Sequence, residues 1–574
     1  MKMTDKGDLV MEKNDSLVVT CGALGTQGEG IARVDGVTLF IPRFLPGERA
    51  RVKVLKVKGS VGYAKVEELL TPAEERVRPR CAVFGKCGGC QLQHIKYRAQ
   101  LRFKTDLVRD ALRKIAGIDF RVASCERSEK EYGYRNKLQL PVGRRNGENV
   151  VGFFAERTHR IVPTDACPLH PDWADKLIDA LKNFMEKCGL DGYDEETGEG
   201  QIRHIVVREL RGKFLVTLVV TVPELKGIDY FLYRLDQIFH EYSFYLNFND
   251  KKTNVIFGDK FQLLKGKGVY DCTDAGIVYE AGPRTFVQVN ENIRSKLYER
   301  AVSCVDEDAV VVDCYAGGGL LTAKFAKKCK KAYGIEVVAE ASACADALRL
   351  RNGLEDKMVN LCGTVEQMLA GVLEKEPSAT VVLDPPRAGC AREVLKLLLE
   401  RKVPEIIMIS CDPATLARDV GLLTGALVEQ DGALVKSDAA QGLYELRSVE
   451  PFDMFPQTRH VETLVLLSKN SDSHINVTVE FGEGEGQISL KEVEKRAEAR
   501  KPKEKVTYKM IQQYIEEHYG FMVHTAYIAE VKRSLGLPMY DAPNAVEELK
   551  RPRSHPTEKM VLAIKETLAH FEII

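Results

Sequence analysis

The chain has little tryptophan and no long apolar segment. Its 574 residues include a single tryptophan, and aromatic residues make up 7% of the sequence. No apolar run approaches the ~20 residues that a membrane-spanning helix needs. The first residues, MKMTDKGDLVMEKND, are polar and lack the apolar segment of a secretory signal. We therefore expect a cytoplasmic protein without a membrane partner.

The chain also lacks net charge, because 83 Lys and Arg balance 83 Asp and Glu. Taken alone, this balance argues against a nucleic-acid partner. The charge is unevenly distributed, however, since the segment from Arg43 to Arg145 holds 25 Lys and Arg against 11 Asp and Glu. A basic region of this kind is typical of proteins that contact a phosphate backbone, although a solvated charged surface would look the same.

The length predicts about four domains. Residues 1–72 include short stretches that alternate apolar and polar positions between glycine-rich turns, which predicts a barrel of about five short strands. In PGERARVKV, Arg49, Arg51 and Lys53 share one face of a strand. With the GxGxAR stretch from Gly28 to Arg33, this pattern resembles a TRAM domain, an OB-like RNA-binding module.

The rest of the chain changes character twice. Residues 73–285 mix strands with a helix predicted over 98–117, which indicates a central α+β domain. Residues 286–470 alternate strands and helices, which predicts a parallel, doubly wound α/β sheet. In the final region, 471–574, we expect an exposed helix or linker over 471–505 and then a small helical extension.

Three of the fifteen cysteines are clustered, in CAVFGKCGGC. Cys81, Cys87 and Cys90 have the spacing C-x5-C-x2-C, and Cys167, followed by proline, is the candidate fourth ligand. Four thiolates can hold zinc or a [4Fe–4S] cluster, and three close cysteines plus a distant one favour the cluster over zinc. Unligated cysteines are the alternative. Because all four irons would be ligated, we expect a structural or RNA-contacting cluster.

A nucleotide site is indicated at three strand ends. AVVVDCYAGGG runs from a strand into a glycine turn, and Glu336 ends the next predicted strand, where a carboxylate can bind ribose hydroxyls. NAD and S-adenosylmethionine (SAM) both fit this pattern. The segment VVLDPPR, in which Asp384 ends a strand, resembles the methyltransferase motif and favours SAM.

Candidate catalytic groups follow in the same domain. Cys411 ends a predicted strand, and Asp412 and Pro413 suit the start of the next helix, whose dipole favours a thiolate. Further on, His460 and Glu462 are expected on one face, with Glu462 as a base. A thiolate, a base and a methyl donor are what methylation at C5 of a pyrimidine requires, since addition at C6 makes C5 nucleophilic.

These motifs together resemble the RNA (uracil-5-)-methyltransferase family over roughly residues 14–470. The matching motifs are CAVFGKCGGCQLQH, RTFVQVN, VDCYAGGG, LDPPRAG, SCDPATLARD and DMFPQTRHVE. The TRAM-like barrel and the four cysteines resemble its bacterial 23S rRNA branch. Departures are mild: YAGGGLL replaces a Gly-Ile-Gly form of the turn, and TFVQVN replaces a more aromatic version.

The resemblance implies a role for each matching residue. A flipped-out or single-stranded uridine of RNA would be the substrate, with no DNA partner. Cys411 would be the nucleophile and Glu462 the base. The helical segment 98–124 would pack on the methyltransferase domain. SAM would contact Gln288, Tyr315, Glu336 and Asp384, and the [4Fe–4S] cluster would be held by Cys81, Cys87, Cys90 and Cys167.

Three other functions remain open from the sequence. The chain could be an RNA-binding iron–sulfur protein with a degenerate methyltransferase domain, an amino-group methyltransferase, or a C5 methyltransferase of tRNA. An amino-group enzyme would need no nucleophilic cysteine and usually carries an aromatic residue where Arg387 stands. The sequence predicts neither the target uridine nor the oligomeric state nor the role of the final hundred residues.

Overall fold

The computed structural model describes residues 2–3, 9–430, 432–437, 442–470, 508–535 and 557–570. Its contacts divide the chain into two compact units, residues 1–474 and 475–574. The linker expected over 471–505 lies outside the described residues. No helix in the described part of the chain combines the length and apolarity needed to cross a bilayer.

The first unit begins with a six-stranded sheet in the order β3-β7-β8-β6-β5-β4, where about five short strands were expected. Ala50, Val52 and Val54 are fully buried while Arg49 and Arg51 are exposed, so the predicted alternation is present. β7 and β8 are longer than the short strands expected, and register shifts along their pairing let the two strands bend. The strands are β3 (Ser16–Thr20), β4 (Ala23–Leu24), β5 (Gly30–Val34), β6 (Val37–Ile41), β7 (Arg49–Lys58) and β8 (Val61–Thr71), preceded by the pair β1 (Lys2–Met3) and β2 (Leu9–Val10).

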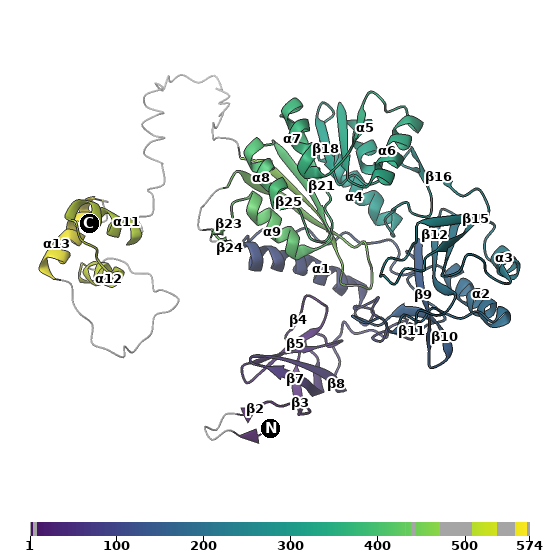
Figure 1. The fold of residues 1–574 in the computed structure, drawn as a ribbon. Helices are drawn as coiled ribbons and strands as arrows, with labels where there is room; N and C mark the ends of the chain where they lie inside the picture. The colour runs from purple at the N-terminus through teal and green to yellow at the C-terminus, as the bar shows by residue number, and fades with distance from the viewer. Residues whose placement is uncertain are drawn as a thin grey trace, which may run out of the picture. The chain divides into compact units, whose positions relative to one another are not determined.

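A long helix follows the barrel. α1 (Tyr97–Ala111) continues into a π-helical turn, η1 (Leu112–Ala116), and Gly117 ends it with φ +74°. The predicted helix over 98–117 is therefore present, and its glycine supplies the left-handed residue that such an end needs. Val108 and Leu112 belong to the same core as the sheet of residues 310–469, far along the sequence. Figure 1 shows α1 beside α9.

The central region forms a second sheet, in the order β11-β10-β9-β12-β13-β14-β15. Helices α2 (Trp173–Cys188) and α3 (Ile228–Asp236) bury their apolar sides against it in one core. The pair β16 (Tyr270–Asp274) and β17 (Ile277–Ala281) leads on to the last sheet. The strands are β9 (Lys137–Arg145), β10 (Glu148–Phe154), β11 (Ile161–Pro163), β12 (Ile202–Leu210), β13 (Lys213–Val220), β14 (Glu241–Phe248) and β15 (Lys260–Lys265).

The last sheet of the first unit is doubly wound, as predicted. Its order is β20-β19-β18-β21-β22-β26-β25; the first five strands pair in parallel, whereas β26 runs antiparallel to both of its neighbours, β22 and β25, a departure from the fully parallel sheet that was expected. The strands are β18 (Val310–Cys314), β19 (Lys331–Glu336), β20 (Met358–Cys362), β21 (Thr380–Leu383), β22 (Glu405–Ser410), β25 (Tyr444–Phe452) and β26 (Glu462–Lys469). The pair β23 (Leu427–Gln430) and β24 (Ala433–Lys436) lies outside this sheet.

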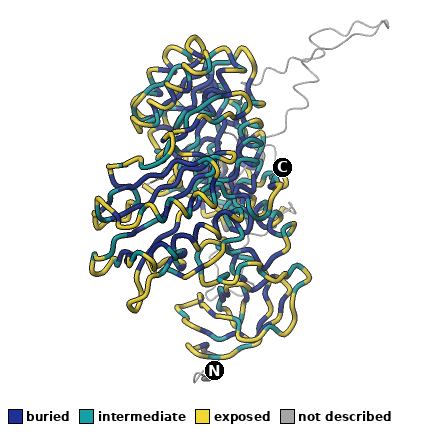
Figure 2. Tube along the Cα trace, turned by 90° about the vertical axis from the view of Figure 1, so that its right-hand side faces the viewer, coloured by how far each residue is buried: buried dark blue, intermediate teal, exposed yellow. Residues whose placement is uncertain are grey.

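Helices cover both faces of this sheet (Figure 1). Alternate residues of one strand enter different cores: Val312 packs with α7, α8 and α9, and Val311 with α4, α5 and α6. Figure 2 shows the resulting buried interior in dark blue. The helices are α4 (Glu291–Ser303), α5 (Leu320–Lys328), α6 (Ala339–Arg351), α7 (Val365–Lys375), α8 (Arg392–Arg401) and α9 (Pro413–Leu423).

The second unit, in its described residues, contains three helices with a core of their own. They are α11 (Tyr508–Tyr519), α12 (Thr525–Ser534) and α13 (Glu558–His570). Ile511, Ile515, Ile528 and Ile564 are fully buried within this core.

Candidate active site

A cavity of about 540 Å³ lies at the carboxyl ends of the parallel strands. The strand order reverses between β18 and β21, and such a switch point is where open α/β sheets bind ligands. Five predicted site residues, contributed by separate segments of the chain, line this one cavity: Gln288, Tyr315, Asp384, Cys411 and Glu462.

The glycine turn after β18 leaves room for a ligand. Tyr315 has φ +67°, an uncommon conformation for a residue with a side chain. A Cβ atom at Gly317 or Gly318 would meet nothing within 4 Å, and both residues line the cavity. The carboxylate of Glu336, at the end of β19, accepts hydrogen bonds from the backbone N–H of Gly317 (2.8 Å) and of Val338 (2.7 Å). Glu336, the sixth predicted residue of the site, is therefore held against the open turn.

Two carboxyl groups of the cavity are shifted toward the neutral form. Burial raises the pKa of Glu462, the first residue of β26, to about 7, while the positive charge of Arg387 opposes that rise. Removal from water also raises the pKa of Asp384 to about 7, and the negative charge of Glu462 adds to the effect. Each carboxyl can therefore gain or lose a proton near neutral pH, which suits acid–base work.

Cys411 follows β22 directly, and the helix expected after it is present. Asp412 caps α9, because its Oδ1 accepts from the N–H of Ala414 (2.9 Å) and of Thr415 (3.1 Å), and Pro413 is the first helical residue. Both local predictions are confirmed.

The pKa of Cys411 is shifted away from the thiolate form that the helix dipole favours. Burial raises the pKa of the Cys411 thiol to about 11, and the nearby Glu462 carboxylate raises it further. Desolvation and a neighbouring negative charge thus outweigh the helix dipole.

Sequence analysis missed the part that Arg387 plays. This residue lines the cavity, and its positive charge lowers the pKa of Cys411 and of Glu462 alike, which favours the ionised form of each. Its signal in the sequence was its place directly after the Asp-Pro-Pro segment. His460 lines the cavity beside Glu462, and burial lowers its pKa to about 4, so its ring is neutral.

Comparisons with known proteins agree with this geometry. Residues 96–470 match the family model described as tRNA (Uracil-5-)-methyltransferase, and residues 15–66 match the TRAM domain. The chain belongs to this uracil-5-methyltransferase family. The family and its fold imply SAM as the methyl donor and RNA as the partner, so the chain is an RNA methyltransferase.

Two curated relatives are uncharacterized RNA methyltransferases. That of Clostridium tetani is 36% identical over 473 residues, covering 81% of this chain and 99% of the relative. That of Halalkalibacterium halodurans is 37% identical over 464 residues, covering 80% and 98%. A Pyrococcus abyssi tRNA (uracil-54, C5)-methyltransferase, solved with S-adenosyl-L-homocysteine, has the same fold, with a TM-score of 0.60 and 24% identity over 79% of this chain and all of that one.

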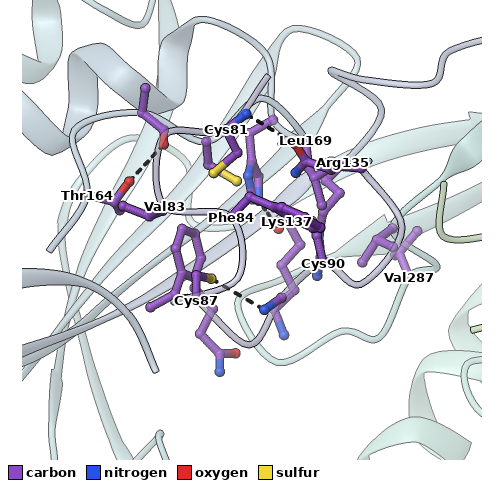
Figure 3. Close-up of a pocket in the computed structure, with 18 of the residues that line it drawn as sticks. Cys81, Val83, Phe84, Cys87, Cys90, Arg135, Lys137, Thr164, Leu169 and Val287 are labelled. Atoms are coloured by element: carbon purple, nitrogen blue, oxygen red, sulfur yellow. Dashed lines mark hydrogen bonds between the residues drawn. The ribbon is translucent and has the colours of Figure 1, made fainter. Parts of the chain in front are cut away.

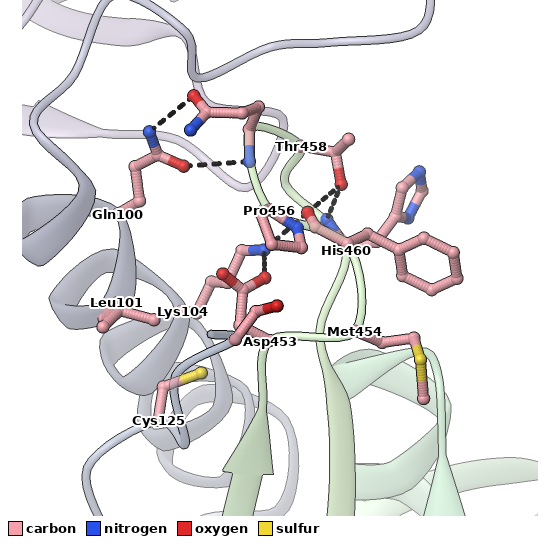
Figure 4. Close-up of polar contacts among 12 residues, drawn as sticks. Gln100, Leu101, Lys104, Cys125, Asp453, Met454, Pro456, Thr458 and His460 are labelled. Atoms are coloured by element: carbon pink, nitrogen blue, oxygen red, sulfur yellow. Dashed lines mark hydrogen bonds and ion pairs between the residues drawn. The ribbon is translucent and has the colours of Figure 1, made fainter. Parts of the chain in front are cut away.

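The loop between β25 and β26 of this methyltransferase is fixed by α1, which lies some 350 residues earlier in the sequence (Figure 4). Lys104 and Asp453 form an ion pair in which neither side chain is exposed, and the Lys104 ammonium also donates to the carbonyl of Phe455 (3.0 Å). Gln100 donates to the side chain of Gln457 (2.9 Å) and accepts from its N–H (3.0 Å). These contacts hold the loop that carries His460 into the cavity.

The four predicted cluster ligands line a second cavity, of about 310 Å³ (Figure 3). Cys81, Cys87 and Cys90 come from the loop before α1, and Cys167 comes from the segment between β11 and α2. Across the described residues, no three His, Cys, Asp or Glu side chains converge closely enough to hold a metal ion. The structure thus gathers the thiols around one space without placing them in ligand geometry.

The charges around this cysteine cavity fit an anionic occupant. Arg135 and Lys137 line it, whereas no acidic residue of the described chain does. The Nε of Arg135 is buried without a hydrogen-bond partner in the described structure. Burial and the neighbouring cysteines raise the pKa of Cys90 to about 12, so this thiol would ionise only with a compensating positive charge. Metal ions supply that charge when thiolates bind them.

Two residues border both cavities of the methyltransferase. Phe286 and Val287 appear in the lining of the active-site cavity and in that of the cysteine cavity. The ring of Phe286 is 76% exposed, which is unusual for so large an apolar side chain. The segment before Gln288 therefore joins the two sites.

Proposed function

We propose that the chain methylates C5 of a uridine in RNA, with 23S rRNA as the substrate and SAM as the donor. The observation that carries the proposal is that one thiol, Cys411, and two carboxyls, Glu462 and Asp384, line a single cavity beside an open glycine turn. A nucleophile, a base and a nucleotide site around one space are what this reaction needs.

SAM supplies a methyl group activated by a positive sulfonium. Glu336, held at the turn, is placed to accept hydrogen bonds from ribose hydroxyls. Tyr315, Gln288 and Asp384 line the space around the turn and would contact the rest of the donor. The carboxyl groups of the cavity suit a cationic ligand, because ionised Asp384 and Glu462 would attract it.

The side chains would act in sequence on the uracil ring. The Cys411 sulfur loses its proton to solvent and bonds to C6, and the ring electrons released to C5 form the new bond to the methyl carbon while the carbon–sulfur bond of the sulfonium breaks and S-adenosyl-L-homocysteine leaves. Glu462, ionised near neutral pH, then takes the C5 proton, and the C6–sulfur bond breaks to release 5-methyluridine and the thiolate. Arg387 supports the charged forms of both catalytic side chains.

The base must leave its stack to reach Cys411, since C6 is covered in a helix. Phe286 offers an exposed ring at the cavity on which such a base can stack. A TRAM domain and a basic region beside it support binding of the surrounding RNA.

We also propose that Cys81, Cys87, Cys90 and Cys167 hold a [4Fe–4S] cluster. The four thiols and the two cations around one cavity support a cluster whose ligands bring excess negative charge. The proposed domains are residues 1–72 for the TRAM barrel, 73–285 for the cluster and RNA region, 286–470 for the methyltransferase, and 471–574 as an extension of unknown role. The segment 98–124 is assigned to the methyltransferase core, which is supported by the contacts of α1.

The decisive experiment incubates the protein with tritiated SAM and unmodified 23S rRNA, with Cys411→Ala alongside. Label at C5 of one or more uridines, located by mass spectrometry and lost in the variant, is the expected result. If tRNA alone became labelled, tRNA would replace 23S rRNA as the proposed substrate. SAM binding without transfer to either RNA would contradict the enzyme assignment.

A mechanism control uses RNA that carries 5-fluorouridine. Fluorine at C5 leaves no proton for Glu462 to remove, so the thiol route stalls as a covalent protein–RNA adduct. Absence of an adduct alongside normal methylation of ordinary RNA would overturn the role of Cys411.

A further inference from the structure

A basic groove lies between the TRAM barrel and the cysteine-rich loop. Its volume is about 780 Å³. Arg43 comes from the barrel, and Arg76, Arg78 and Arg80 come from the segment that leaves it. No acidic residue of the described chain lines the groove.

The four arginines are not equivalent. Arg76 is committed to the protein, since its guanidinium binds the fully buried Glu48 (2.5 and 2.7 Å) and the carbonyl of Arg43 (2.8 Å). Arg43, Arg78 and Arg80 are exposed and form no ion pair with a described residue. The guanidinium of Arg80 lies over the ring of Tyr132, 4.4 Å from its centre, which orients it. Three cations are therefore available to a ligand.

A second, independent feature points to a ligand in the same groove. His94 lines it, is only 1% exposed, and has no hydrogen-bond partner at either ring nitrogen within the described structure. A buried polar group without a hydrogen-bond partner destabilises the protein, so an acceptor in the groove that paired with His94 would relieve that cost. Its ring stays neutral and can donate one N–H, because burial, together with the charges of Arg76 and Arg43, keeps its pKa low.

We propose that this groove binds the phosphodiester backbone of the RNA substrate, with Arg43, Arg78 and Arg80 as the contacts to phosphate and His94 as a neutral donor. Guanidinium groups match phosphate oxygens in shape and charge. Contacts of this kind fix the orientation of an RNA without reading its sequence. The inference rests on the proposed function only in taking RNA as the partner; it assigns no role in the chemical step.

The test measures binding of a fluorescent single-stranded oligouridylate across a salt series, by anisotropy, with the whole chain. In the triple variant Arg43→Gln, Arg78→Gln, Arg80→Gln, affinity should fall ~10-fold or more, and the slope of log affinity against log salt should flatten by about 2. Arg76 is left in place, because its loss would leave the buried Glu48 carboxylate without its ion-pair partner. The corresponding Arg→Lys triple variant should keep most of the affinity, since it keeps the charge.

The matched control removes the same charge elsewhere, with Arg392→Gln, Arg401→Gln and Arg447→Gln, which are ion-paired on the methyltransferase domain. Thermal unfolding and SAM binding check that every variant is folded. Unchanged affinity and slope in the groove variant, or an equal loss in the control, would overturn the proposal. Because oligouridylate binding is scored without methyl transfer, a protein that binds through the groove but methylates no uracil would contradict the proposed function alone.

Discussion

The active-site cavity and the cysteine cavity share Phe286 and Val287 but are opposite in electrostatic character. The first contains two carboxyls whose pKa is raised to about 7, with Arg387 as the nearby cation. The second contains four thiols and two cations without an acid among the described residues. The first therefore suits a cationic donor and proton transfer at neutral pH, and the second suits an anionic group that does not change during the reaction.

The largest effect is expected from replacing Glu462, the proposed base of the active-site cavity. Glu462→Gln should lower turnover by ~10²–10⁴-fold, because the C5 proton loses its acceptor. Methyl transfer itself needs no base at C5, so a methylated covalent adduct should accumulate, visible as a shifted band on a denaturing gel. Glu445→Gln, an exposed change on β25, should turn over as the parent does. A variant that lost turnover without any adduct would place Glu462 before the methyl-transfer step.

The next effect concerns the cysteine cavity. Cys90→Ser in protein purified without oxygen should abolish bound iron, because one of four ligands is lost, and should lower the thermal midpoint. Iron analysis and visible absorption measure the outcome. Cys188→Ser, at the end of α2 and outside the cavity, should retain the parent's iron. Iron-free parent protein of normal stability would contradict the cluster.

The carboxyls of the active site should also leave a signature in stability. Glu462 has a pKa of about 7 in the folded protein against an ordinary 4.5, so the folded state holds the proton longer. The free energy of unfolding should therefore decline as pH rises from about 4.5 to about 7, with Glu462 responsible for about 3 kcal/mol. Urea unfolding across this window, compared with Glu462→Gln, isolates that share. Identical pH slopes in the two proteins would contradict the raised pKa.

The smallest effect tests the cations of the cysteine cavity. Arg135→Gln should keep iron but release it a few-fold faster to a chelator, because the negative charge around the cluster is less compensated. Arg144→Gln, an exposed arginine paired with Asp191, is the control for charge. Equal release rates in the two variants would show that the cations serve something other than the cluster.

Much of the candidate active site could be predicted from the sequence, because its position depends on a local pattern of strand and turn. A buried strand followed by a turn marks the carboxyl end of a parallel strand, and all such ends meet at one edge of the sheet. That reasoning placed Tyr315, Asp384 and Cys411 together, and the structure has them around one cavity. The cap of α9 by Asp412 was local in the same sense.

The sequence could not predict properties that depend on burial and on charges contributed by distant segments of the chain. The raised pKa of Cys411 is one example, since its causes are desolvation and the charge of Glu462, fifty-one residues later, and both oppose the effect of its own helix. The buried pair of Lys104 and Asp453 was equally invisible, since α1 resembles any amphipathic helix until its partner loop is known.

The sequence by itself thus determined the N-terminal TRAM domain, the doubly wound sheet and the sheet edge at which the candidate site lies, because periodicity and turn residues record local backbone geometry. Only the tertiary structure decided which groups are charged, which loop α1 holds in place, and how the cysteines, Arg135 and Lys137 come to line one cavity. Burial and Coulomb energies depend on every neighbour in space, whereas a motif records only neighbours along the chain.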